Sequence, residues 1–169
     1  MAVSEIHHVT VVVSDLERSE RFYVHLLGYR PTLRMRVGGA DTEEGLGLPP
    51  GTTGEVVYLQ GPTRIGQVEL VRWDTEPGTQ ARTSYRDLGP MVICFSVDDA
   101  ELEAAYARAR ELGARLHSVP HRSRLDNYGE IGVFVAEDPD GTMVEFVSLP
   151  SPEQVRAVRA ARTGQNGDV

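Results

Sequence analysis

Lysine is absent from this 169-residue chain, and all 17 of its basic residues are arginine. A chain without lysine has neither a Schiff-base nucleophile nor the lysine of a phosphate-binding P-loop, which excludes two large groups of enzymes. The formal net charge is −8, and no run of arginines forms a stripe that would follow a phosphate backbone. We therefore expect no nucleic-acid partner.

Cysteine and long apolar runs are also scarce. The single cysteine, Cys94, cannot form a disulfide within the chain. The longest apolar runs, such as VTVVV at 9–13, are far too short to span a bilayer, and the first residues, MAVSEIHH, lack the pattern of a signal peptide. These absences favour a cytoplasmic protein without a membrane partner. The 40% apolar content is typical of globular chains.

An internal repeat organises what is present. Residues 6–13 alternate like a strand and lead into a helical pattern that Gly28 ends, and residues 91–97 lead into a second helix that Gly113 ends. The first helix follows Ser14 to Glu17, which have the form of a capping box, and Asp98 or Asp99 caps the second. When the copies are aligned, His8 in the first faces Val92 in the second.

Three strands are predicted after each helix, near 29–36, 55–60 and 66–72 in the first half and 115–119, 131–136 and 142–148 in the second. The fold class is therefore α+β, with two tandem βαβββ modules at 5–73 and 90–149, a linker at 74–89, and a helix and frayed tail at 150–169. Residues 37–54 form a glycine-rich loop of a length typical of lids and binding loops. DPDG at 138–141 predicts a hairpin turn rather than a calcium site.

Two glutamates occupy the same place in the two modules. Glu69 lies within VELV and Glu145 within VEFV, each in the last strand of its module. One carboxylate in an apolar strand usually faces solvent, but two at equivalent repeat positions favour a shared role. If the modules pair about a pseudo-twofold axis, both carboxylates and His8 converge on one cavity. Such a group requires a cation, or a proton on one carboxylate.

Together these segments resemble the vicinal oxygen chelate superfamily, which includes glyoxalase I, methylmalonyl-CoA epimerase, extradiol dioxygenases, fosfomycin-resistance enzymes and bleomycin-resistance proteins. The likeness covers roughly residues 5–149 and is carried by IHHV, SDLERSERFYVHLLGY, VELV, VICFSVDD, LEAAYARARELGA and DPDGTMVEF. The resemblance implies a cupped, mostly antiparallel sheet around a divalent metal, usually in a homodimer, with a small-molecule substrate or ligand.

The resemblance also implies which residues bind the metal. His8, Glu69 and Glu145 match three of the family's ligand positions, and the fourth is Val92, which cannot bind a metal. Three ligands leave positions open for water or substrate. One imidazole with two carboxylates favours Mn²⁺, Mg²⁺, Fe²⁺ or Co²⁺, while Ni²⁺ and Zn²⁺ stay open. This set differs from the two-histidine, one-carboxylate triad of iron dioxygenases. A dioxygenase activity is therefore less favoured than the other activities of the family.

The other histidines and the cysteine are expected to lie outside the site. His7 should point to the opposite face from His8, because neighbours on a strand alternate. His117 and His121 are expected on the surface. Cys94 is expected to pack in the core rather than act as a nucleophile.

Two functions remain open. The first is a metal-dependent isomerase, epimerase or lyase that acts on a small oxygenated substrate through an enolate-type intermediate. Glu145 or Glu69 then moves the proton, with Glu44 or its neighbour Glu43 as another base, and Arg122 and Arg124 are candidates for an anionic substrate group. We favour this function, because a purely apolar pocket gains nothing from two buried carboxylates. The second is a metal-free protein that binds a drug or metabolite, which Val92 favours.

Overall fold

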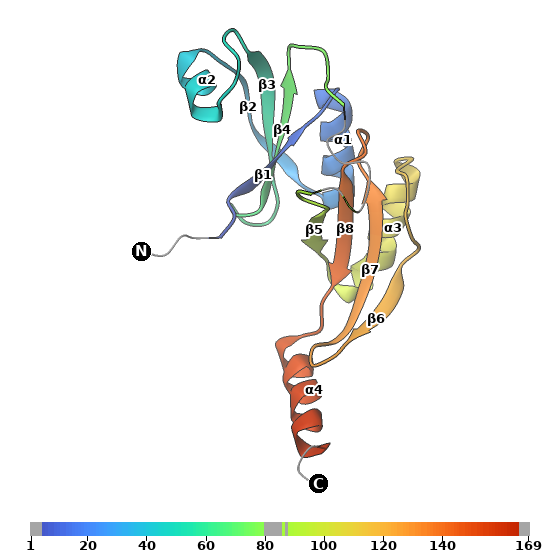
Figure 1. Cartoon of the computed structure of the whole chain (residues 1–169). Helices are drawn as coiled ribbons and strands as arrows, with labels where there is room; N and C mark the ends of the chain where they lie inside the picture. Colours follow the sequence, from blue (N-terminus) through green and yellow to red (C-terminus); the bar gives the residue numbers. More distant parts are fainter. Residues whose placement is uncertain (1–4, 80–85, 87, 166–169) are drawn as a thin grey trace. The chain divides into compact units, whose positions relative to one another are not determined.

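The computed structural model describes residues 5–79, 86 and 88–165 of the chain (Figure 1). The chain divides into two compact units, one formed by residues 1–87 with 138–141 and the other by residues 88–137 with 142–169. Each unit contains one four-stranded sheet with a long helix packed on it.

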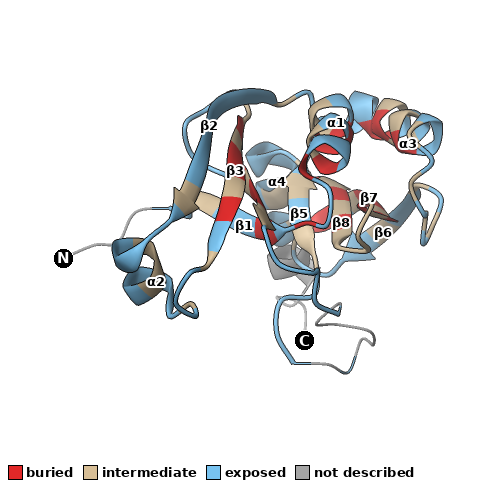
Figure 2. Ribbon diagram, turned by 90° about the horizontal axis from the view of Figure 1, so that it is seen from above, coloured by how far each residue is buried: buried red, intermediate tan, exposed pale blue. Residues whose placement is uncertain are grey.

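The first unit is a βαβββ module with one added helix. Its elements are β1 (His8–Val12), α1 (Leu16–Leu27), β2 (Arg30–Gly38), α2 (Ala40–Leu46), β3 (Thr53–Gln60) and β4 (Gln67–Trp73). The sheet order is β1-β4-β3-β2, with β1 parallel to β4 and the other pairs antiparallel. The helix α1 covers one face of this sheet, where alternate strand residues are fully buried (Figure 2), among them Val57, Leu59, Val68 and Leu70.

The helix α1 begins one residue later than the capping-box prediction places it. Asp15 is the N-cap, and its side chain accepts a hydrogen bond from the Arg18 backbone N–H. Ser14 instead donates from its backbone N–H and its hydroxyl to Asp140, in the DPDG turn. Gly28 ends the helix in the left-handed conformation, as predicted, because glycine has no Cβ to oppose a positive φ.

The second unit repeats the same order. It contains β5 (Ile93–Ser96), a 3₁₀ turn η1 (Asp99–Glu101), α3 (Leu102–Glu111), β6 (His121–Leu125), β7 (Gly129–Glu137), β8 (Met143–Ser148) and α4 (Pro152–Gln165). The sheet order is β5-β8-β7-β6, again with a parallel pair, β5 and β8, formed by the first and last strands of the module. The predicted α+β class and the two βαβββ modules are therefore confirmed.

The strand predicted at 115–119 is wrong. That segment contributes only an isolated bridge from Leu116 to Ala136, and the strand that pairs with β7 is β6, beyond Pro120. Proline has no backbone N–H to donate to a ladder, so continuous pairing begins after it. As a result Arg122 and Arg124 lie on a strand, not on a loop.

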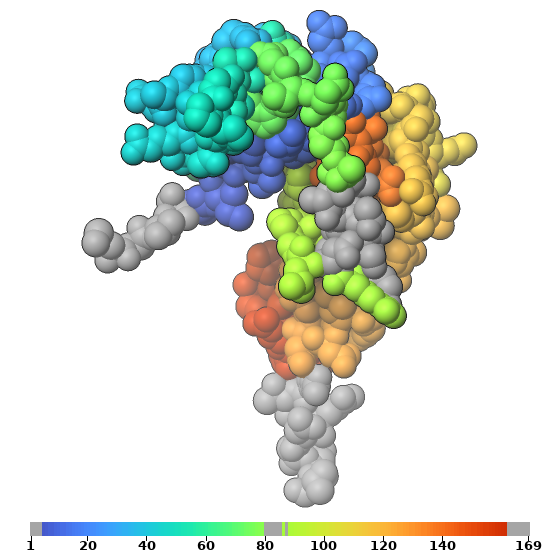
Figure 3. Space-filling model, turned by 45° about the horizontal axis from the view of Figure 1, so that its top comes forward, coloured from blue at the N-terminus to red at the C-terminus, as the bar shows by residue number. Residues whose placement is uncertain are grey.

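The glycine-rich segment 37–54 is also more ordered than predicted. It contains the helix α2, whose first turn carries Asp41 and Glu43, and acidic groups there suit the helix dipole. The Glu43 carboxylate accepts a hydrogen bond of 2.6 Å from the Gly51 backbone N–H, which closes the segment on itself. In the space-filling view the blue-green α2 region stands at the surface of the first unit (Figure 3).

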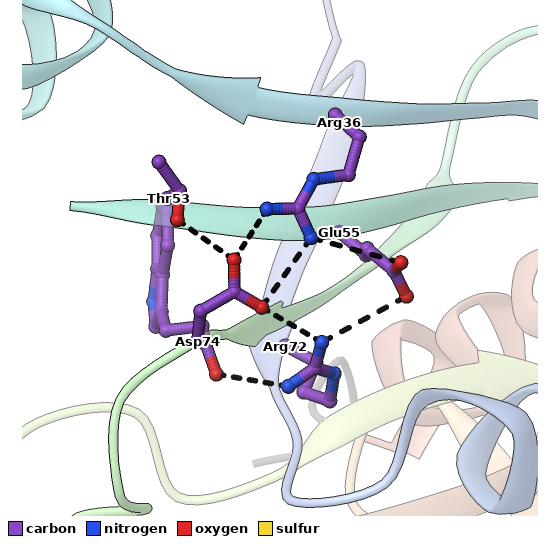
Figure 4. Close-up of polar contacts among 6 residues, drawn as sticks. Arg36, Thr53, Glu55, Arg72 and Asp74 are labelled. Atoms are coloured by element: carbon purple, nitrogen blue, oxygen red, sulfur yellow. Dashed lines mark hydrogen bonds and ion pairs between the residues drawn. The ribbon is translucent and has the colours of Figure 1, made fainter.

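An ionic cluster joins three strands at one end of the first sheet (Figure 4). Asp74, just after β4, accepts hydrogen bonds from Arg36 on β2, from the Thr53 hydroxyl at 2.7 Å and from Arg72 at 2.8 Å. Glu55 faces both arginines, with N–O separations of 3.7 and 3.9 Å. Hydrogen bonds from Arg36 and Thr53 hold the pKa of the Asp74 carboxyl well below its ordinary value.

The C-terminal helix α4 starts where the sequence predicts. The Ser151 hydroxyl accepts from the Gln154 backbone N–H, and the Gln154 side chain accepts from the Ser151 N–H, a reciprocal cap. The helix reaches Gln165, three residues into the frayed tail predicted at 163–169, and the rest of that tail lies outside the described residues. Among the helices that the structure describes, none is long and apolar enough to cross a membrane.

Candidate functional site

Four polar side chains lie on one face of the first sheet. His8 and Thr10 come from β1, Tyr58 from β3 and Glu69 from β4. The register places Thr10 opposite Glu69 and Glu69 opposite Tyr58, and residues opposite each other share a face. The alternate residues of these strands pack beneath α1, so the four side chains lie on the face that α1 leaves uncovered.

Glu69 is the centre of this group. The Thr10 hydroxyl donates a hydrogen bond of 2.5 Å to its Oε2 atom, and His8 Nε2 lies 3.4 Å from the same oxygen. Burial raises the pKa of the Tyr58 hydroxyl to about 12, and its hydrogen bond to Glu69 contributes to the shift. Tyr58 therefore stays protonated and is a donor to the carboxylate, which fixes the position of Glu69.

The spacing of His8 and Glu69 suits a shared metal as well as a long hydrogen bond. Nitrogen-to-oxygen hydrogen bonds in proteins are about 2.7–3.2 Å long, shorter than the 3.4 Å found here. Two ligand atoms each about 2.1 Å from a tetrahedral metal lie about 3.4 Å apart. The side chain of His8 is 35% exposed and that of Glu69 is 13% exposed, so the pair is within reach of solvent. The nitrogen and oxygen donors therefore fit two ligand positions.

A complete ligand set is not found within the part of the chain that the structure describes. No group of three or more histidine, cysteine, aspartate or glutamate side chains there is arranged to hold a metal ion. His8 and Glu69 are brought together in the first unit, whereas Glu145 lies on β8 in the second. The predicted contribution of Glu145 to the same site stays a prediction.

His7 does not behave as predicted. It lies just before β1, outside the regular alternation of the strand, and its Nδ1 atom is 2.9 Å from Nδ1 of His8. The two rings are perpendicular, with centroids 5.2 Å apart. The expectation that the two imidazoles point to opposite faces is therefore wrong, because it applied the alternation of a strand to a residue that precedes it.

The second sheet has the same strand register as the first, but different side chains surround its glutamate. Cys94 lies opposite Glu145, as Thr10 lies opposite Glu69, and Val135 takes the place of Tyr58. Val92 precedes Cys94 by two residues, as His8 precedes Thr10, and it is half-buried. This register supports the alignment of His8 with Val92. Glu145 thus has a thiol and a valine where Glu69 has two hydroxyl groups.

Cys94 is exposed, so the expectation that it packs in the core is wrong. Residues of β5 alternate, and it is Phe95 that contacts the core ring of Phe146. Partial burial raises the pKa of the Cys94 thiol to about 12, and the hydrogen bond to Glu145 adds to the shift. A thiol with so high a pKa is a poor nucleophile at neutral pH, in agreement with the sequence interpretation on that point.

The arginines proposed for substrate binding lie on the other face of the second sheet. Arg122 pairs with Gly132 and Arg124 with Glu130, whereas Glu145 pairs with Val135. Even-numbered and odd-numbered residues of β7 lie on opposite faces of the sheet. The Arg122 guanidinium forms a two-point ion pair with Asp99. The structure therefore does not bring either arginine to the face that carries Glu145.

The remaining candidates lie on other segments of the chain. Glu44 is exposed on α2. His117 and His121 are both exposed, as expected, and His117 Nε2 lies 2.6 Å from a carboxylate oxygen of Glu137. Sequence reasoning missed Thr10 and Tyr58, although their alternation with valine and leucine in VTV and VYL could have indicated that they share the face of Glu69.

Comparison with known proteins agrees with this architecture. A model of the glyoxalase/bleomycin resistance protein/dioxygenase superfamily matches residues 5–146. No curated protein matched the chain.

Solved structures share the fold at low sequence identity. A glyoxalase family protein from Bacillus cereus is 19% identical with a TM-score of 0.72, over 89% of this chain and 97% of that one. A glyoxylase/bleomycin resistance protein/dioxygenase domain from Frankia sp. EAN1pec is 20% identical with a TM-score of 0.62, over 92% and 99%. The fosfomycin resistance protein FosX of Mesorhizobium loti is 19% identical with a TM-score of 0.58, also over 92% and 99%. With the family match across both βαβββ modules, these findings show that the chain belongs to the glyoxalase/bleomycin resistance protein/dioxygenase superfamily.

Proposed function

We propose that this protein is a divalent-metal-dependent isomerase, epimerase or lyase that acts on a small oxygenated substrate. The observation that carries the proposal is the pairing of His8 Nε2 with Glu69 Oε2 at 3.4 Å on the uncovered face of the first sheet. A bound divalent cation supplies positive charge that stabilises negative charge developing on substrate oxygens.

The surroundings of Glu69 support its role as a ligand. Metal-binding carboxylates are commonly held by further hydrogen bonds, and partners of this kind raise metal affinity by 10-fold to 100-fold. Thr10 and Tyr58 both donate to Glu69. These two donors fix the carboxylate beside His8 before a metal arrives, so less ordering is required on binding.

Glu145 is proposed as the third ligand or as the group that moves the proton. Its nearest register neighbours are a protonated thiol and a valine, so it is less firmly held than Glu69. A carboxylate with fewer fixed donors is freer to exchange between a metal and a substrate proton. The proton-transfer roles of Glu69 and Glu44 stay predictions beside it.

The test is metal content and metal-dependent stability. The protein purified without chelator is analysed for bound metal, and its thermal unfolding is followed while Mn²⁺, Co²⁺, Ni²⁺ or Zn²⁺ is added. A ligand that binds only the folded state at a concentration 100 times its Kd adds about 2.7 kcal/mol of stability. We expect a metal-dependent rise in Tm that is lost in His8→Ala and Glu69→Gln.

Three further variants make the test specific. His121→Ala removes an exposed histidine and should leave the metal response unchanged. Glu145→Gln should weaken the response if Glu145 is the third ligand. Val92→His should strengthen it if the fourth family position faces the metal. The absence of bound metal and of any shift in the unaltered protein would contradict the proposal.

A second candidate, a metal-free protein that binds a drug or metabolite, is favoured by one observation. The residues that correspond to His8, Thr10 and Tyr58 of the first unit are Val92, Cys94 and Val135 in the second. The surroundings of Glu145 are therefore largely apolar. In that case the unaltered protein binds small molecules without any metal, and His8→Ala leaves their affinity unchanged.

A further inference from the structure

The two adjacent histidines form part of a line of polar contacts that runs across β1 and β4. Gln67 Nε2 donates to the Arg64 carbonyl oxygen at 2.9 Å and lies 3.4 Å from His7 Nε2. His7 Nδ1 lies 2.9 Å from His8 Nδ1, and His8 Nε2 lies 3.4 Å from Glu69 Oε2. The line therefore begins at a backbone carbonyl and ends at a carboxylate.

The contact between the two rings requires one of them to donate. A neutral imidazole carries one N–H donor and one acceptor nitrogen, so two Nδ1 atoms at 2.9 Å attract only when one is protonated and the other is not. The rings alone do not decide which. The direction is set by the groups at the two ends of the line, because tautomers follow the hydrogen-bond network around them.

The first end of the line is Gln67, and it fixes His7. Gln67 is only 8% exposed, and a carbonyl oxygen can only accept, so the amide nitrogen is the atom that faces Arg64. That nitrogen has a second N–H, which is directed to His7 Nε2. His7 Nε2 is then the acceptor, and the proton of His7 is on Nδ1. The backbone N–H of Gln67 also donates to the His7 carbonyl at 3.0 Å, which holds the two residues together.

The second end of the line is Glu69, and it gives the same answer for His8. Because His7 donates from Nδ1, His8 Nδ1 accepts and the proton of His8 is on Nε2. That proton faces the Glu69 carboxylate, which can only accept. Both ends of the line therefore require the same direction of donation.

We propose that Gln67 and His7 are positioning residues that hold His8 in its Nε2–H tautomer, with the proton directed at Glu69. The tautomer assignment rests on these contacts alone, while its consequence for metal binding rests on the proposed function. A metal that binds His8 Nε2 has to displace this proton. The line of contacts from Gln67 through His7 to His8, which we call the relay, therefore opposes metal binding.

The direct test is the tautomer of each ring, read from ring ¹H–¹⁵N correlations of uniformly labelled protein. The spectra are recorded at about pH 8.5, and a tautomer is assigned only to a ring that shows a single N–H. His25 is an internal reference, because its Nδ1 lies 2.7 Å from the Arg21 carbonyl oxygen and must be protonated. We expect His7 to match His25, with a protonated Nδ1, and His8 to show a protonated Nε2.

The unaltered protein can overturn the proposal by itself. A protonated Nδ1 on His8, or an average of both tautomers on either ring, contradicts it. In Gln67→Leu, which removes the donor, His7 should lose its tautomer preference. In Gln67→Glu, which offers His7 an acceptor, both rings should exchange tautomers. A Gln67→Glu spectrum unchanged from that of the unaltered protein also contradicts the relay.

Metal affinity gives a second readout. Gln67→Glu frees the His8 Nε2 lone pair, so Zn²⁺ should bind on the order of 10-fold more tightly. Gln67→Glu combined with His7→Phe keeps the added charge but breaks the relay, and it should lose that gain. An equal gain in Zn²⁺ affinity in the double variant would show that the added charge causes it. That result would overturn the claim that the relay opposes metal binding. If no variant binds metal, the proposed function fails while the tautomer assignment stands on its spectra.

Discussion

At the scale of single residues, the two halves of the chain differ where the chemistry is. The frames match strand for strand, with Glu69 and Glu145 at equivalent positions. Around Glu69 the neighbours can donate or accept protons, whereas around Glu145 they are a thiol and hydrocarbon. The two units therefore share a fold, and the polar group around Glu69 lies on the sheet of the first unit.

The environment of Cys94 leads to a prediction about reactivity. Burial and the hydrogen bond to Glu145 raise the pKa of this exposed thiol to about 12. Only the thiolate reacts, so at about pH 8 Cys94 should react with a disulfide reagent on the order of 100-fold more slowly than free cysteine. Stopped-flow or plate-reader kinetics with an aromatic disulfide measure this rate.

Glu145→Gln provides the matched comparison. It removes the negative charge beside the thiol but leaves the burial, which is the larger cause of the raised pKa. The reaction should therefore become faster without reaching the rate of free cysteine. A rate for unaltered Cys94 equal to that of free cysteine would contradict the raised pKa, and an unchanged rate in Glu145→Gln would show that Glu145 does not face the thiol.

The sequence allows only part of the site to be predicted. His8 and Glu69 follow from strand alternation and from the repeat, and the structure brings them together. The contact of His7 with His8 does not follow, because it depends on where β1 begins. The ion pair of Arg122 with Asp99 does not follow either. It requires that 121–125, and not 115–119, pairs with β7, and local sequence does not determine that pairing.

At the scale of secondary-structure elements, the ionic cluster at Asp74 holds β2, β3 and the end of β4 together. Hydrogen bonds from Arg36 and Thr53 lower the pKa of Asp74 in the folded protein below its ordinary 3.8. The cluster therefore contributes stability above that ordinary pKa. The contribution is lost as the pH falls below 3.8 toward the lower pKa of the folded state.

Asp74→Asn tests this contribution. The variant should have a lower Tm than the unaltered protein at neutral pH, and the difference should shrink as the pH falls from about 5 to about 2. Thermal unfolding followed by circular dichroism across this range measures both effects. Asp126→Asn, at an exposed position, is the control and should follow the unaltered protein. A difference that does not depend on pH would contradict the role assigned to the Asp74 charge.

Elements were predictable where local patterns decide them. Periodicity and caps locate both ends of α1 and the start of α4 to within one residue. The strand after α3 was misplaced, because 115–119 alternates in the same way as a strand but is followed by Pro120. The helix α2 was missed because its seven-residue length and its internal glycine, Gly45, give no periodic signal.

At the scale of the whole molecule, the DPDG turn is the place where the chain passes from the second unit into the first and back. The Tyr23 hydroxyl of α1 donates a buried hydrogen bond of 3.0 Å to Asp138, which is only 5% exposed. Burial and the Asp138 charge raise the pKa of Tyr23, so it remains a donor at any physiological pH.

Tyr23→Phe should lower the free energy of unfolding by about 2 kcal/mol, because a buried carboxylate loses a donor. Urea denaturation measures the change. Tyr29→Phe, which removes a hydroxyl 3.3 Å from the Gly66 carbonyl in an exposed setting, should cost about 0.5 kcal/mol. Equal effects from the two variants would contradict a special role for the turn.

The homodimer implied by the family resemblance stays a prediction, which light scattering during gel filtration would test.

The central claim is that His8 and Glu69 together bind a divalent metal, and anomalous diffraction tests it most directly. A crystal soaked in Zn²⁺ and measured at the zinc absorption edge should show a peak about 2.1 Å from both His8 Nε2 and Glu69 Oε2. The same map would show whether Glu145 reaches that metal. A map with no anomalous density between these two atoms at saturating Zn²⁺ would contradict the account.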